Sequence, residues 1–189
     1  TIPNTKIVIC AGNHDAIKKG SFYDGFKWSE NVIFIDDKNI TKVDIPELNT
    51  CVYGLSYHET EIQENLYDHI IVEDIDKINI LPINKKKLAM SGFDYVALGH
   101  IHKPEMDEKN RMAYCGSLEP IDMNDMGERG YIYGEVTKNS LELEFVPFAK
   151  RIYKEIDFQV TTTATNMEIR HRLTDMIEEN GKDNMFKIF

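Results

Sequence analysis

The chain has 189 residues, of which 42% are hydrophobic and 29% charged, and 22 basic against 32 acidic side chains give a formal net charge of −10. This composition excludes intrinsic disorder, and no apolar run approaches the roughly 18 residues that a membrane helix needs. A pI near 5.1 argues against a protein that coats nucleic acid by surface charge, although a nuclease can obtain local positive charge from its metals. Three scattered cysteines and the lack of a secretion signal predict a cytoplasmic protein with reduced thiols.

Short β-type runs dominate the first 150 residues and are separated by loops rich in Asn, Asp, Gly and Pro. Helical patterns are fewer there, and they predict short helices over residues 59–67 and 82–91. The turn Lys138-Asn139-Ser140 predicts a hairpin between the last two strands. The predicted strands cover residues 7–10, 31–36, 51–55, 69–72, 77–81, 95–98, 130–136 and 141–146.

The strongest helix signal lies near the end of the chain, over residues 165–180. Thr165 and Glu168 form a capping-box pattern, and Gly181 follows the last turn. Residues 184–189 then predict the beginning of another strand. We therefore expect one domain over residues 1–155 and the start of a second, incomplete domain over residues 156–189. The apolar face of the helix comprises Ile169, Leu173, Met176 and Ile177.

Two motifs with chemically useful side chains directly follow apolar strands. In the first, Gly12 permits a sharp turn and Asn13, His14 and Asp15 follow it. In the second, Gly99 precedes His100-Ile101-His102. If this backbone is extended, both imidazoles point to one side, where they can approach one metal cluster, and Ile101 faces the core.

Each motif alone has an ordinary structural interpretation. Asn-His-Asp after a strand can be a turn with side-chain-to-backbone hydrogen bonds, and His-x-His can be two surface or satisfied core histidines. Both motifs follow strands of one predicted domain, however, and that combination favours a metal site over either structural interpretation.

These residues carry a family resemblance. The segments Gly12-Asn13-His14-Asp15 and Gly99-His100-x-His102 resemble motifs of the calcineurin-like metallophosphoesterases. The segments Leu98 to Pro104, Tyr114 to Pro120 and Gly127 to Tyr131 resemble more narrowly the SbcD-type DNA repair exonuclease subunits. The resemblance implies an α/β (α+β) fold, namely a four-layer β-sandwich flanked by helices with a small α/β capping domain. It also implies that DNA is hydrolysed at a two-metal site, usually with manganese. The implied partner is an SbcC-type ATPase, and the implied assembly contains a homodimer.

Carried over to this sequence, the resemblance assigns Asn13 and His100 to one metal and His102 to the other. It places His14 beside the scissile phosphate, as a stabilising or proton-donating catalytic group. Asp15 would orient His14 or its loop, and Gly12 and Gly99 would support the turns. Two-metal hydrolysis uses both cations to neutralise charge on the transition state.

The sequence departs from the family pattern in two places. The early Asp-x-His and Gly-Asp motifs are absent before Gly12, and no His follows the predicted strand at residues 77–81. We therefore expect that segments before Thr1 and near residues 80–82 are missing, and that the chain as it stands binds one metal weakly and is inactive. The alternatives are a phosphodiesterase for small or cyclic nucleotides on the same fold and a non-catalytic scaffold subunit.

Overall fold

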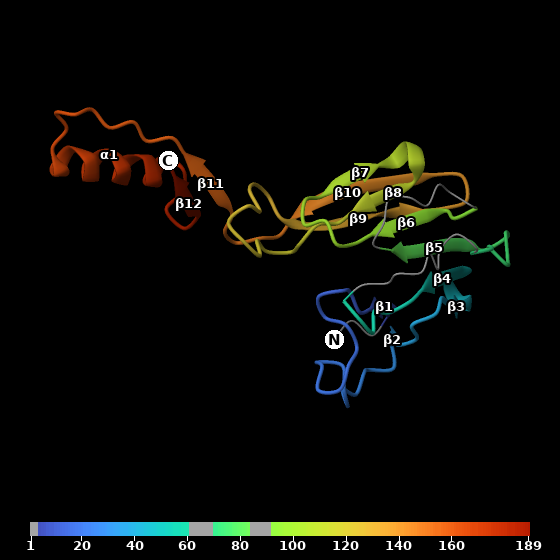
Figure 1. Cartoon of the computed structure of the whole chain (residues 1–189). Helices are drawn as coiled ribbons and strands as arrows, with labels where there is room; N and C mark the ends of the chain where they lie inside the picture. Colours follow the sequence, from blue (N-terminus) through green and yellow to red (C-terminus); the bar gives the residue numbers. More distant parts are fainter. Residues whose placement is uncertain (1–3, 61–69, 84–91) are drawn as a thin grey trace.

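The computed structural model describes residues 4–60, 70–83 and 92–189 (Figure 1). Its single α-helix in this part is α1 (Asn166–Glu179), and two short 3-10 helices are η1 (Pro46–Leu48) and η2 (Glu108–Asn110). The strands are β1 (Ile7–Cys10), β2 (Val32–Ile35), β3 (Thr41–Ile45), β4 (Thr50–Gly54), β5 (Ile78–Ile83), β6 (Tyr95–Leu98), β7 (Glu105–Asp107), β8 (Met112–Tyr114), β9 (Gly130–Val136), β10 (Leu141–Pro147), β11 (Tyr153–Ile156) and β12 (Met185–Ile188).

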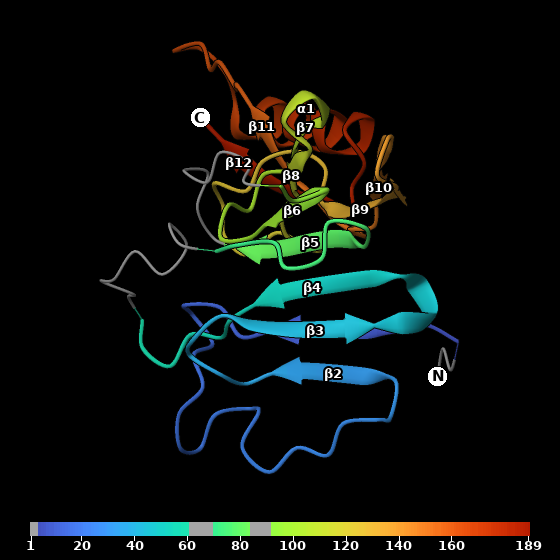
Figure 2. The same cartoon turned by 90° about the vertical axis from the view of Figure 1, so that its right-hand side faces the viewer.

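A six-stranded mixed sheet with the order β3-β4-β5-β6-β8-β7 forms the centre of the molecule. Strands β4, β5, β6 and β8 run parallel, whereas β3 and β7 pair antiparallel at the two edges. Figure 2 shows β3, β4, β5 and β6 stacked in this order. The parallel strands are apolar because neighbouring segments cover them. They supply most of the core, which contains Cys51, Tyr53, Leu55, Leu81, Phe93, Val96, Leu98, Met112 and Tyr114.

Strands β1 and β2 form a separate parallel pair that lies close to β4. Gly54 marks the contact, because a Cβ atom at this position would lie 2.9 Å from Cδ1 of Ile35 and 3.0 Å from Sγ of Cys10. Two hydrogen bonds continue the contact beyond the strands: Ala11 N–H donates to Oγ of Ser56 over 2.7 Å, and Tyr57 N–H donates to the Ala11 carbonyl over 3.0 Å. The segment after β1 is therefore fixed against the segment after β4.

The remaining elements form two further pairs. The predicted hairpin is confirmed as β9 and β10, with Thr137 N–H donating to the Ser140 carbonyl across the turn. Strands β11 and β12 pair in parallel, and α1 connects them. Figure 1 shows these three elements at the opposite end of the molecule from β1 and β2. Strand β11 spans the expected domain boundary at residue 155, and that division stays a prediction.

Helix α1 begins as the sequence predicts. Thr165 accepts a hydrogen bond from Glu168 N–H, and the Glu168 carboxylate accepts one from Thr165 N–H, so the capping box is complete. Gly181 has φ +85°, a conformation that favours glycine after a helix. The predicted apolar face is half-buried.

Several predicted elements are wrong or lie outside the described residues. The strand predicted over residues 69–72 is wrong for residues 70–72, which have no regular structure, and residue 69 is outside the description. The predicted helix over residues 82–91 is wrong at its start, since residues 82–83 belong to β5, and residues 84–91 are outside the description. Residues 59–60 form a bend, and the rest of the helix predicted over residues 59–67 is also outside it.

The missing segment expected near residues 80–82 stays a prediction. Strand β5 runs without interruption through these residues, pairing with β4 up to Ile80 and with β6 from Ile80 onward.

The described fold confirms the predicted α+β class, a multi-stranded mixed sheet with few helices. None of the helices in the described ranges has the length and apolarity to cross a membrane.

Candidate metal centre

The loop after β1 carries the first motif and is held by Asp15. Gly12 N–H donates to Oδ1 of Asp15 over 2.7 Å, and the Tyr23 hydroxyl donates to the other oxygen of the same carboxylate. Burial, together with the hydrogen bond to Asp15 and its charge, raises the pKa of Tyr23 to about 12, so the phenol remains a donor at neutral pH. The contacts of Asp15 thus close the turn that presents His14, whose side chain is exposed.

The loop after β6 carries the second motif, and its backbone differs from the expectation. His100 has φ +71° and Ile101 N–H donates back to the Gly99 carbonyl, so the segment is a tight turn rather than an extended strand. Ile101 is 44% exposed. The predicted extended backbone with Ile101 in the core is therefore wrong. A left-handed conformation at a non-glycine residue stores strain, and such strain is commonly found at functional sites.

The turn nevertheless brings the predicted histidines together. His14, His100 and His102 line one cavity of about 540 Å³, and the rings of His14 and His100 are nearly parallel, with centroids 6.2 Å apart. Asn13 is not among the described residues that line this cavity. The supporting residues Gly12 and Gly99 both line a neighbouring, largely apolar cavity where β1 approaches β4, β5 and β6. The carboxyl ends of β1 and β6 thus meet at one place, as the motifs require.

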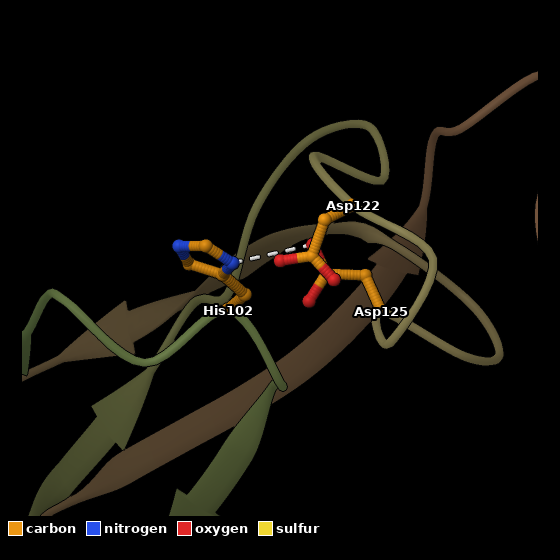
Figure 3. A group of neighbouring side chains, drawn as sticks. All are labelled: His102, Asp122 and Asp125. Carbon is orange, nitrogen blue, oxygen red and sulfur yellow. Dashed lines mark hydrogen bonds and ion pairs between the residues drawn. The ribbon is translucent and has the colours of Figure 1, made fainter.

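A third loop, between β8 and β9, reaches the same cavity with side chains that were not predicted. Ligand atoms of His102, Asp122 and Asp125 lie within 4.8 Å of one another (Figure 3). Nδ1 of His102 lies 3.2 Å from Oδ2 of Asp125, and Nη2 of Arg129 lies 3.5 Å from its Oδ1. Asp125 and Arg129 are 7% and 4% exposed. The loop therefore adds a buried ion pair, Asp125 with Arg129, to the histidine cavity.

The surroundings of Asp125 favour its ionised form. Burial alone would raise the pKa of this carboxyl, but the N–H groups of Ile121 and Asp122, together with the nearby His102 ring and the Arg129 guanidinium, outweigh it. The net effect is a pKa below the ordinary value. Asp125 is thus a carboxylate at neutral pH and acts only as a hydrogen-bond acceptor.

Sequence reasoning missed this loop because its residues look like turn formers. Asp122 and Asp125 stand in a segment rich in Asn, Asp and Gly, where such residues ordinarily make local hydrogen bonds. The contact between His102 and Asp125 crosses 23 positions of sequence. The available signal was the sequence around Gly127 and Arg129, which contributed to the family resemblance without a residue role.

Comparison with known proteins gives distant relatives. No family model matches the chain. It is 25% identical over 200 residues to the uncharacterized metallophosphoesterase YhaO of Bacillus subtilis, covering 92% of this chain and 46% of that protein. It is also 25% identical over 164 residues to the DNA double-strand break repair protein Mre11 of Methanocaldococcus jannaschii, covering 74% of this chain and 44% of that protein.

The chain is thus similar to one protein named as a metallophosphoesterase and to one named for DNA repair. It spans a little under half the length of these two relatives. The relationship supports the family expected from the motifs and implies the use of a divalent metal.

The cavity fits such a metal. Imidazole side chains from two loops line one space, and imidazole nitrogen is a common ligand of manganese, zinc and related divalent ions in proteins. His102 presents one nitrogen to Asp125, and the other is on the far side of the ring from both carboxylates (Figure 3). The described residues thus offer at least one imidazole in the arrangement that metal-binding histidines use.

Proposed function

We propose that this chain contributes to the catalytic centre of a metal-dependent phosphodiesterase that degrades DNA as an SbcD-type exonuclease subunit. The observation that carries the proposal is the convergence of His14, His100 and His102 from two strand-end loops on one cavity. The likeness to a protein named for DNA double-strand break repair supports DNA as the substrate.

In this proposal the histidines have separate roles. His102, and His100 with Asn13, would hold divalent ions, with Mn²⁺ as the preferred metal. The chemistry that such ions supply is Lewis-acid activation of water and neutralisation of phosphoryl charge. His14 is exposed to the cavity and belongs to a loop fixed by Asp15, so it is placed to bind the phosphate or to donate a proton to the leaving oxygen.

The partners proposed for the whole protein are DNA and an SbcC-type ATPase subunit, in an assembly that contains a homodimer. The formal net charge of −10 does not favour binding of DNA through the overall charge of the chain. We therefore propose that the bound metals attract the DNA phosphate backbone locally and that the partner subunit binds long DNA.

The test is cleavage by the full-length protein with Mn²⁺, using linear double-stranded DNA, bis(p-nitrophenyl) phosphate and a cyclic nucleotide. We expect DNA and the small ester to be cleaved, and His14→Asn to slow cleavage by about 100-fold or more. His171→Asn is the matched control, because His171 is an exposed residue of α1. Cleavage of the cyclic nucleotide without DNA would replace the nuclease with a small-nucleotide phosphodiesterase, and no cleavage of any substrate would support a scaffold subunit.

A further inference from the structure

The Asp125 carboxylate lies beside His102, the proposed metal ligand, and protein groups contact both of its oxygens. Its Oδ2 accepts a hydrogen bond from Ile121 N–H over 2.9 Å and lies 3.2 Å from Nδ1 of His102. Its Oδ1 faces the Arg129 guanidinium, which in turn donates to the carbonyls of Met126 and Glu128 over 2.9 and 2.8 Å. Both oxygens are thus engaged by protein groups.

We propose that Asp125 is a positioning residue that fixes the tautomer and the ring orientation of His102 for metal binding. This inference rests on the proposed function, since it assumes that His102 is a metal ligand. A carboxylate only accepts hydrogen bonds, so Nδ1 of His102 carries the proton and the Nε2 lone pair is free. Figure 3 shows Nε2 on the side of the ring away from Asp122 and Asp125. The same carboxylate–histidine arrangement raises ligand basicity in metal sites.

The competing interpretation is that His102, Asp122 and Asp125 bind one ion directly. The contacts argue against it. Asp125 lies next to the positive charge of Arg129, which would repel a cation, and both of its oxygens already have partners. Asp122 is exposed and accepts a hydrogen bond from Asn124 N–H over 2.7 Å. A positioning role for Asp125 keeps all these contacts in place.

The backbone of His102 is held independently of Asp125. Ser117 N–H donates to the His102 carbonyl over 3.1 Å, and Gly130 N–H donates to the Ser117 carbonyl over 3.1 Å. Gly116 also packs on this carbonyl, with φ +75°. Removing the Asp125 carboxylate should therefore release the His102 ring without moving its main chain, so a variant reports on ring positioning.

The experiment starts with ¹⁵N NMR of the histidine rings in the metal-free 189-residue chain. We expect the Nδ1–H tautomer for His102. An Nε2–H tautomer in this state would overturn the proposal. The measurement uses the native chain without metal or DNA, so it is independent of variant folding and of nuclease activity. A chain that shows the expected tautomer but whose full-length protein cleaves no DNA would contradict the proposed function alone.

The second arm is calorimetric titration with Mn²⁺. Asp125→Asn should weaken binding about 10- to 100-fold, and Asp125→Glu should recover part of the loss. Asp122→Asn is the matched control, with an expected change of less than about 3-fold, because Asp122 is outside the proposed contact. Unchanged binding in Asp125→Asn would refute the positioning role. Equal losses in the two Asn variants would show that both carboxylates ligate the ion directly, which also refutes it.

Discussion

Gly116 offers a direct test of how the third loop fixes His102. Its φ is +75°, and a Cβ atom there would lie 2.6 Å from the His102 carbonyl oxygen and 3.0 Å from the Pro104 nitrogen. Both contacts are with backbone atoms, which cannot rotate away as a side chain can. Gly116→Ala must therefore displace the main chain of the His102 loop.

Gly127 provides the matched control. It has φ +79°, almost the same conformation, but a Cβ atom there would meet nothing within 4 Å among the described residues. Gly127→Ala should cost only the left-handed conformation, about 1 kcal/mol of unfolding free energy. Gly116→Ala should add overpacking of about 1–3 kcal/mol, for a total of about 2–4 kcal/mol.

The assay is urea unfolding of both variants and the parent chain, followed by Mn²⁺ titration of each. We expect Gly116→Ala alone to weaken metal binding, because it moves the His102 loop. Equal losses of unfolding free energy in the two variants would refute the packing argument. A destabilised Gly116→Ala with unchanged metal binding would refute the link between this contact and the His102 ring.

Three further predictions concern the surroundings of the site and the C-terminal helix. Arg129→Met should lower the free energy of unfolding by about 3–5 kcal/mol, because it removes the cationic partner of the buried Asp125 carboxylate. The exposed Arg151→Met should change it by less than about 0.5 kcal/mol, and urea unfolding measures both. The folded-state pKa of Asp125 is lowered, so the stability that its carboxylate contributes is present above its unfolded pKa and is lost as pH falls through the folded value. Acid titration followed by circular dichroism should show a shallower loss of stability in Asp125→Asn than in the parent chain, and identical acid profiles would contradict this. Thr165→Ala should lower the free energy of unfolding by about 1 kcal/mol, because it removes the capping box of α1. Amide exchange of the helix should accelerate more in this variant than in Thr174→Ala, since the Thr174 hydroxyl donates to the Arg170 carbonyl within the helix.

The parts of the fold that depend on local pattern could be predicted from the sequence. A few consecutive residues are enough to predict the apolar strands before Gly12 and Gly99, the hairpin turn at Lys138 and the capped helix at Thr165. Other strands could not be found in this way. Strands β7 and β8 have three residues each and exist through pairing with each other and with β6, which is tertiary information.

The site was predictable to the same extent. The sequence placed His14, His100 and His102 directly after two strands, and the carboxyl ends of β1 and β6, which belong to different sheets, do bring these histidines to one cavity. The turn at His100, with its positive φ, has no local signature in the sequence. The contact between His102 and Asp125 depends on how the loop after β8 folds back onto His102, and no spacing rule gives that.

The central claim is that the two strand-end motifs form one divalent-metal site, and Mn²⁺ titration of the chain observed by histidine-ring NMR tests it most directly. We predict that paramagnetic Mn²⁺ first broadens the ring signals of His100, His102 and His14, which line one cavity, and leaves the exposed His171 of α1 sharp. Broadening of His171 at the same Mn²⁺ concentration as the other three, or no selective broadening of the three cavity histidines, would contradict the account.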